Sequence, residues 1–199
     1  MNKNHVFGGI AVLALIAVYF IFFSSTVYSF NSGLTQINSL WEKQELKPVD
    51  LTSPVKVYSL NEAKLINLKA GLTEFHSAVE KQEASEDKEK LLLLTEIELD
   101  LVDNALIQKK NFDLIDFFDS TEYDFDVLCS SMNKIDEFEA NLLLQKDSAE
   151  AFNLKSAEFS SSFPVEAEKA EVSFLSLQFS SDNKLSQLTS IISTIKGVC

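Results

Sequence analysis

The sequence predicts an all-α protein in which a single N-terminal transmembrane helix precedes an antiparallel bundle of two long helical hairpins. Three observations indicate this fold class. An uninterrupted apolar segment lies near the N-terminus, only five Gly and three Pro occur in 199 residues, and apolar residues recur at helical spacing in four later segments. An irregular stack of α-helical repeats is the alternative architecture, although the chain shows no repeat signature near a period of about 34 residues.

The apolar segment is long enough to cross a membrane. Residues 6–23 carry no charge and no polar group apart from the Tyr19 hydroxyl, and these 18 residues would rise about 27 Å as a helix, close to the thickness of a hydrocarbon core. Aromatic residues crowd the end of the segment, as is typical of a membrane interface. They are Tyr19, Phe20, Phe22, Phe23, Tyr28 and Phe30. Residues 6–28 are therefore predicted to form an uncleaved signal anchor.

Two other interpretations of this segment stay open. The tripeptide Val-Tyr-Ser at 27–29 would suit a signal peptidase, although a secretory signal normally has a shorter apolar core. The pair Gly8-Gly9 resembles a prepilin processing site, although no basic residue directly precedes it. Cleavage at the first site would release a secreted domain, and cleavage at the second would give a pilin-like filament subunit.

The charges that flank the apolar segment predict its orientation. Lys3 precedes the segment, and the next basic residue is Lys43. Because positively charged flanks stay on the cytoplasmic side, residues 1–5 are expected in the cytoplasm and the C-terminal domain outside it. The expected location is the cell membrane, with a single pass and with lipid contacts through residues 6–28.

Residues 29–58 predict a juxtamembrane helix followed by a connector. In 31–47, apolar residues lie on one side of a helix that Pro48 would end. These residues are Leu34, Ile37, Trp41 and Leu46. The stretch 48–58 contains two prolines and several β-branched residues, which are typical of an extended chain.

Residues 59–199 predict a four-helix domain whose first hairpin spans about 59–110. Ser59 and Glu62 fit a capping box, and an apolar stripe follows it at three- and four-residue spacing. The stripe consists of Leu65, Leu68, Leu72, Phe75 and Val79. A second helix, from a cap at Ser85 to about Lys110, is apolar over most of its circumference and is expected to pack on more than one neighbour. Its exception is an acidic stripe of Glu89, Glu96, Asp100 and Asp103.

The second hairpin is predicted to span 119–197. A third helix begins near Asp119, whose spacing to Glu122 repeats the capping pattern. Its apolar side consists of Phe125, Leu128, Met132, Ile135, Phe138 and Leu142, and continues more weakly to Phe159. Pro164 suits the first position of a fourth helix. The stripe of this helix consists of Phe174, Leu177, Leu185, Leu188, Ile192 and Ile195.

The second hairpin brings the two cysteines of the chain together. If the hairpin turns near Ser162, Cys129 lies 33 residues before the turn and faces the region near Ile195. Cys199 lies only about 6 Å further along the axis, within the slack of a frayed helix end. On the oxidising side of a membrane, Cys129 and Cys199 are therefore predicted to form a disulfide. The alternative is two unrelated thiols.

No residue pattern predicts catalysis, a cofactor or a metal. His76, the only histidine after the apolar segment, has no local context that would make it a base for Cys129. Glu96, Asp100 and Asp103 share a helix face, but di-metal bundles also need Glu-x-x-His pairs, so a solvated face is expected. The acidic stretch 111–126 lacks the glycine of a calcium-binding loop and is expected to cap helices and face water.

Composition narrows the function to a class. All 17 basic residues are lysines and the net charge is −13, so a nucleic-acid partner is disfavoured, because the arginines that commonly contact phosphates and bases are missing. The remaining expectation is a membrane-anchored, non-catalytic interaction or scaffold module outside the cytoplasm, with a protein partner or a homo-oligomer. The alternatives are a ligand-binding sensor or accessory subunit of a membrane complex, and a pilin-like filament subunit.

Overall fold

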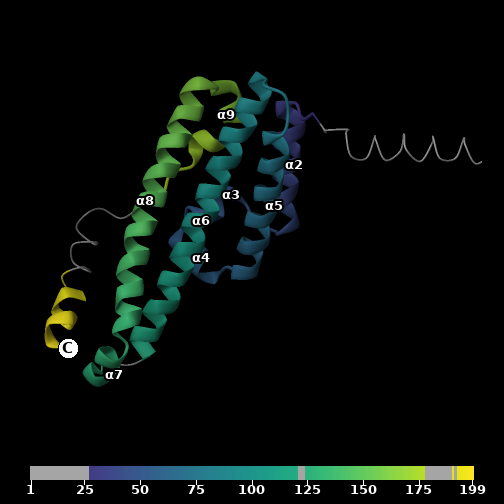
Figure 1. The fold of residues 1–199 in the computed structure, drawn as a ribbon. Helices are drawn as coiled ribbons and strands as arrows, with labels where there is room; N and C mark the ends of the chain where they lie inside the picture. The colour runs from purple at the N-terminus through teal and green to yellow at the C-terminus, as the bar shows by residue number, and fades with distance from the viewer. Residues whose placement is uncertain (1–26, 121–123, 178–189, 191) are drawn as a thin grey trace, which may run out of the picture.

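The computed structural model describes residues 27–120, 124–177, 190 and 192–199, and these residues form an all-α fold without strands (Figure 1). The predicted anchor 6–28 lies almost entirely outside the described residues. Within the described part of the chain, no helix is long and apolar enough to span a bilayer. The all-α class that the sequence predicts is therefore confirmed for these residues.

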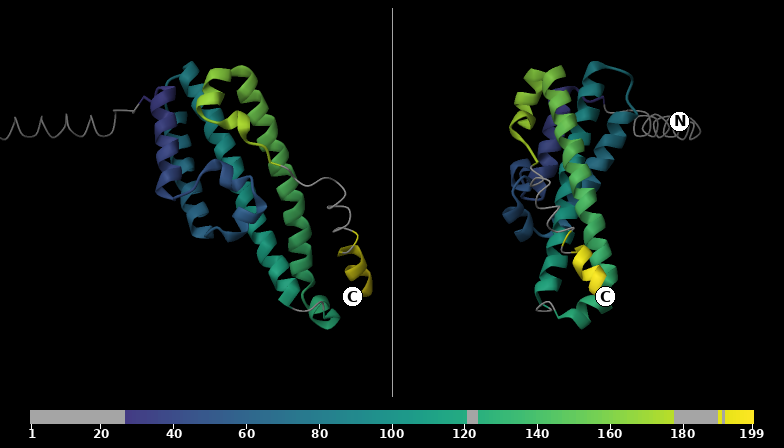
Figure 2. Two further views of the ribbon diagram at one scale, coloured as in Figure 1. Left: turned by 180° about the vertical axis from the view of Figure 1, so that it is seen from behind. Right: turned by 90° about the vertical axis from the view of Figure 1, so that its left-hand side faces the viewer.

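Two long helices form the frame of the fold. Helix α6 (Glu86–Ser120) has 35 residues and packs along α8 (Met132–Ser162), with the short helix α7 (Phe125–Ser130) near the turn between them. Helix α5 (Glu62–Glu80) packs on α6 away from α8 (Figures 1 and 2). The predicted stripe of α5 is buried throughout, and Ser85 Oγ accepts a hydrogen bond from Lys88 N–H at 3.1 Å at the start of α6, as the sequence predicts.

Helix α2 (Phe30–Lys43) packs against both α5 and α6. Its buried side chains are Phe30, Ile37 and Trp41. Two glycines permit this close packing, because a β-carbon at Gly33 would lie 2.4 Å from a methyl group of Leu91, and one at Gly71 would lie 2.9 Å from a methyl group of Leu40. The juxtamembrane helix that the sequence predicts is thus part of the same core as the residues after 59.

The connector 48–58 is not extended as predicted. It forms two short helices, α3 (Pro48–Leu51) and α4 (Pro54–Ser59), and each has a proline in its first turn. Proline suits that position because the first backbone N–H groups of a helix have no intrahelical partner. The predicted cap at Ser59 is also wrong, since Ser59 ends α4 and the Asn61 side chain caps α5 by accepting from Ala63 N–H at 2.9 Å.

The boundary between the second and third helices differs from the prediction. Helix α6 continues ten residues beyond Lys110 to Ser120, so Asp119 lies inside it instead of capping the next helix. Residues 111–120 contain no Gly or Pro that would end the helix, and Leu114 is buried against α8 residues. Asp124 is the cap of α7, because its Oδ1 accepts from Asp126 N–H at 2.9 Å.

The prediction of a long fourth helix is also wrong. Pro164 starts a helix as predicted, but α9 (Pro164–Lys169) has only six residues and a single 3-10 turn, η1 (Val172–Phe174), follows it. Phe174, predicted to be in the core, is 77% exposed. The Asn153 side chain pairs with both the N–H and the C=O of Leu177, at 3.1 and 2.8 Å, and so holds this part of the chain outside a helix. Leu185 and Leu188 lie outside the described residues, and residues 192–198 are again helical.

The described residues form two apolar clusters. The larger one lies in what we call the body, residues 28–112 and 143–177, and the smaller one in the distal arm, residues 113–120, 124–142 and 192–199. The smaller cluster consists of Leu114, Ile135, Phe138, Leu142 and Ile192. Between the clusters, Asn104 Nδ2 donates to the Gln145 carbonyl at 3.0 Å and Asn111 Nδ2 donates to Gln145 Oε1 at 2.8 Å. This buried polar layer separates the two cores.

The chain enters the body at the end opposite the distal arm (Figures 1 and 2). Tyr28 N–H donates to Gln82 Oε1 at 3.2 Å, and the Tyr28 and Phe75 rings meet edge to face at 5.1 Å. The Phe30 and Phe159 rings lie 6.4 Å apart. Tyr28, the last residue of the predicted anchor, and Phe30 just after it are therefore packed against the body.

Candidate interaction groove

Helices α5, α6 and α8 enclose an open groove. Helices α5 and α8 each pack along α6 but make few contacts with each other, so the face of α6 between them is uncovered. The groove has a volume of about 660 Å³. Its apolar lining consists of Ile66, Leu106, Ile107, Leu144 and Ala151, and its charged lining of Glu62, Lys69, Asp100, Asp103, Lys110 and Asp147.

The apolar lining includes an aliphatic side chain on each wall that remains half exposed. Ile66 of α5 is 53% exposed and Leu144 of α8 is 54% exposed. The floor between them includes Leu106 and Ile107 of α6, which are only partly buried. Covering this apolar surface with another apolar surface would remove both from water and lower the free energy of the system.

The acidic stripe of α6 does not simply face water. Asp103 pairs with Lys69 of α5 at 2.6 Å, whereas Asp100 pairs with Lys155 of α8 at 2.9 Å. Glu96 also contacts Lys155, at 3.3 Å. The stripe therefore joins α6 to both neighbours, which sequence periodicity alone does not predict because the cationic partners lie far away in the chain.

Partial burial and ion pairing act in opposite directions on Lys155. Burial lowers the pKa of this ammonium group, but hydrogen bonds to Asp100 and Glu96 outweigh burial and raise it. The side chain is about one third exposed, so water screens these ion pairs in part. The pairs connect α8 to α6 beside the groove.

Two carboxylates of the groove walls have no cationic partner among the residues that the structure describes. Glu62 lies on α5 and Asp147 lies on α8, and neither forms an ion pair with another described residue. Lys110, at the end of the groove toward the distal arm, likewise has no acidic partner in the described part of the chain. The walls therefore present negative charge beside the apolar lining.

Glu98 is a buried carboxyl group that the sequence analysis missed. It lies on α6 in the body core and is 3% exposed. Burial raises its pKa to about 8, and the Trp41 indole of α2 offsets this only in part. The signal in the sequence is a single glutamate within an apolar face, next to Leu94, Ile97 and Leu101.

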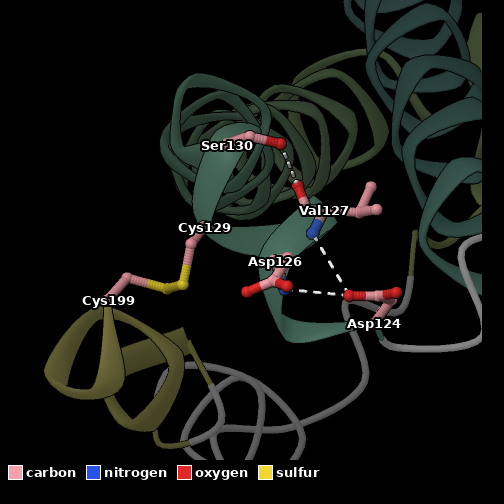
Figure 3. The surroundings of a disulfide bond; sticks show 6 residues. All are labelled: Asp124, Asp126, Val127, Cys129, Ser130 and Cys199. Atoms are coloured by element: carbon pink, nitrogen blue, oxygen red, sulfur yellow. Dashed lines mark hydrogen bonds between the residues drawn. A yellow bond between two sulfur atoms is a disulfide. The ribbon is translucent and has the colours of Figure 1, made fainter.

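The two cysteines lie side by side in the distal arm, one on α7 and the other at residue 199 (Figure 3). Cys129 of α7 and Cys199 are joined by a disulfide, with their Cα atoms 5.3 Å apart. Cys129 is on α7 and not on a continuous third helix, so the helix register from which the pairing is predicted is not the one observed. Formation of this bond in the cell stays a prediction for an oxidising compartment.

Ion pairs lie beside the disulfide. Lys196 of the C-terminal helix contacts Asp136 at 2.6 Å and Glu139 at 2.8 Å on α8. These hydrogen bonds to Asp136 and Glu139 raise the pKa of Lys196. The C-terminal helix is thus attached to the arm by one covalent link and by two charge contacts.

The other residues considered for chemistry do not assemble into a site. His76 lies in the body, where its Nε2 is 3.8 Å from Glu96 Oε1, and Cys129 lies in the distal arm. In the acidic stretch 111–126, Asp116 accepts a hydrogen bond from the Tyr58 hydroxyl at 3.1 Å and Asp124 caps α7. Among the residues with described positions, no group of three or more His, Cys, Asp or Glu side chains is placed to hold a metal ion.

Comparisons with protein-family models, curated proteins and solved structures found no match to this chain. The groove, with its apolar lining and acidic walls, is therefore the main guide to function.

Proposed function

We propose that this chain is a membrane-anchored, non-catalytic α-helical interaction module displayed on the extracytoplasmic side. The main support is the groove between α5, α6 and α8, where half-exposed aliphatic side chains from two helices flank a partly apolar floor. Amphipathic helices of other proteins bind in grooves of this kind.

The sequence and the entry point of the chain support an anchor. The apolar run 6–23 has the length of a membrane helix. The residues that follow it, from Tyr28 onward, are tied to the body by hydrogen bonding and ring contacts. In this arrangement the body would stand close to the membrane and the distal arm would point away from it.

The charge bias and the cysteines support an extracytoplasmic domain. Lys3 favours a cytoplasmic N-terminus. A disulfide between Cys129 and Cys199 persists in an oxidising compartment and is rare in the cytosol. The disulfide argument depends on the topology, because the bond is expected only if the domain lies outside the cytoplasm, so free thiols at both positions in native membranes would weaken both.

Protease treatment of intact cells tests the display of the domain. Fragments from residues 31–199 should disappear while a cytoplasmic control protein stays intact. The mass of the mature protein should include Met1 or begin directly after it. Full protection of the domain would contradict the topology, and a mature N-terminus near Phe30 or Gly9 would replace the anchor with a secreted domain or a filament subunit.

Chemical cross-linking in native membranes tests the interaction. The lysines spread over the surface should form reproducible cross-links to a second polypeptide at the abundance of the endogenous protein. A chain that yields only internal cross-links, while a known membrane complex in the same sample is captured, would contradict an interaction module.

A further inference from the structure

We propose that the groove binds an amphipathic helix of a partner protein whose apolar stripe has Lys or Arg residues along both edges. This inference rests on the proposed function and specifies the chemical class of the partner. Three features of the groove support it: its shape, its apolar lining and the placement of its charges.

The shape of the groove suits one helix. Its lining runs along α6 from Asp100 to Lys110, which corresponds to about 15 Å or nearly three helical turns. A helix laid in this space would contact α5, α6 and α8 together. It would complete a four-helix arrangement from three helices that already pack side by side.

The apolar lining suits a narrow stripe on the bound helix. Ile66 and Leu144 lie on opposite walls, and Leu106 and Ile107 lie on the floor. Apolar residues at positions i, i+3, i+4 and i+7 of a partner helix form a stripe that would cover these four side chains.

The charges determine what must lie at the edges of that stripe. On the floor, Asp100 and Asp103 are already paired with lysines of the neighbouring helices. On the walls, Glu62 and Asp147 have no such partner among the described residues. Basic residues on both edges of the partner helix would pair with these carboxylates, whereas acidic residues would be repelled.

A second copy of this chain is a poorer occupant. The net charge of −13 makes two copies repel each other, and all basic residues are outnumbered by acidic ones, 17 against 30. Lys110 lies at one end of the groove, where its ammonium group would repel a basic side chain of the partner. There it would favour the negative C-terminal end of the bound helix.

The test measures binding of designed peptides to the full-length chain in micelles of a detergent with a neutral head group. One peptide of about 18 residues has a leucine stripe with lysines on both edges, and its matched control has glutamates in place of the lysines. The lysine peptide should bind at least about tenfold more tightly than the glutamate peptide, a difference that salt should reduce.

Two matched double variants locate the binding site. Ile66→Gln with Leu144→Gln removes apolar surface from both walls of the groove and should weaken lysine-peptide binding by about tenfold or more. Leu143→Gln with Leu154→Gln changes two leucines outside the groove, 52% and 72% exposed, and should leave binding unchanged. Partition of the peptide into the micelle affects all proteins equally, and circular dichroism establishes that both variants are folded.

A third variant tests the charges. Glu62→Gln with Asp147→Asn should weaken lysine-peptide binding several-fold and make it less dependent on salt. Equal binding of the two peptides, or no binding of either one, would overturn the proposal. So would an equal loss of affinity for the lysine peptide in the groove variant, Ile66→Gln with Leu144→Gln, and in its control, Leu143→Gln with Leu154→Gln. Dimers of the full-length chain that Ile66→Gln with Leu144→Gln dissociates would also overturn it and would assign the groove to a second copy.

Failure of this inference is distinguishable from failure of the proposed function. If the groove does not discriminate between the peptides but lysines of the distal arm form cross-links to another protein in native membranes, the interaction module stands and the groove is excluded. If no cross-link to another protein forms anywhere, the function itself is contradicted.

Discussion

The body and the distal arm share the two long helices α6 and α8, yet they are held together differently. In the body, these helices are covered by α2, α5 and α9, and side chains such as Leu72, Ile97 and Phe152 are completely buried. In the arm, the described residues supply a small cluster, the disulfide and the ion pairs of Lys196. The stability of the body therefore comes mainly from apolar burial, whereas the stability of the arm depends more on the disulfide and the ion pairs of Lys196.

The largest expected effect distinguishes the two cores. Phe152→Ala in the body should lower the free energy of unfolding by roughly 3 to 5 kcal/mol, because the Phe152 side chain is completely buried and its removal leaves a cavity in the core. Phe138→Ala is the matched change on the same helix in the arm, and it should have a smaller effect. Urea denaturation of both variants measures the two changes in the free energy of unfolding. Equal decreases would contradict the distinction between the body and the arm.

Removal of the disulfide should lower stability and loosen the native arm more than the native body. Cys129→Ser with Cys199→Ser opens a loop with a sequence separation of 70 residues, which the chain-entropy model values at up to roughly 4 kcal/mol. Hydrogen exchange should accelerate more in 124–142 and 192–199 than in α5. Reduction of the wild-type protein by a thiol should reproduce this pattern, whereas an equal acceleration throughout α5 would show that the arm and the body are one cooperative unit.

The buried carboxyl group of Glu98 makes the stability of the body depend on pH. In the folded state the pKa of Glu98 is about 8, whereas its usual pKa is 4.5. Between these two pH values the folded state binds more protons than the unfolded state. Stability therefore falls as the pH rises from 4.5 to 8. The loss between pH 6 and pH 8 should be about 2 kcal/mol.

Two variants isolate this pH effect. Glu98→Gln should remove most of the loss above pH 6, because the amide does not titrate. Glu96→Gln, two residues away on the outer face of α6, is the control and should keep the wild-type slope. Thermal denaturation at a series of pH values measures both, and an unchanged slope in Glu98→Gln would show that another group causes the dependence.

The smallest expected effect concerns the ion pairs of the arm. Lys196→Met removes both contacts to α8 but keeps most of the aliphatic side chain. Because these groups are partly exposed to water, the loss should be slight and should diminish at high salt. Hydrogen exchange of residues 192–199 is the sensitive measurement, and a large loss of global stability would contradict a local role.

The predictable parts of this fold are those with local causes. The five-residue stripe of α5 and the first turn of α9 at Pro164 follow from spacing and from proline geometry, and both are observed. The disulfide partners are predicted from two continuous antiparallel helices, and the structure pairs Cys129 with Cys199 although neither helix is continuous as predicted.

The parts that the sequence did not predict depend on contacts distant in the chain. Asn153 supplies the hydrogen bonds of Leu177, which a helix stripe cannot indicate. The polar layer of Asn104, Asn111 and Gln145 separates the two cores across a hairpin. The groove itself arises because α5 and α8 pack on different faces of α6, and periodicity within one helix does not determine which faces its neighbours leave uncovered.

Site-specific photo-crosslinking in intact cells tests whether the groove binds a basic amphipathic helix outside the cytoplasm. A photoreactive residue replaces Leu144 in the groove or, as the control, Leu154, which is 72% exposed on the same helix. We expect that the residue at position 144 forms an adduct with one partner protein and that the linked peptide is a basic amphipathic segment. Protease added outside the cell should remove this adduct. Equal adducts at both positions, no adduct at Leu144, or an adduct protected from the protease would contradict these expectations.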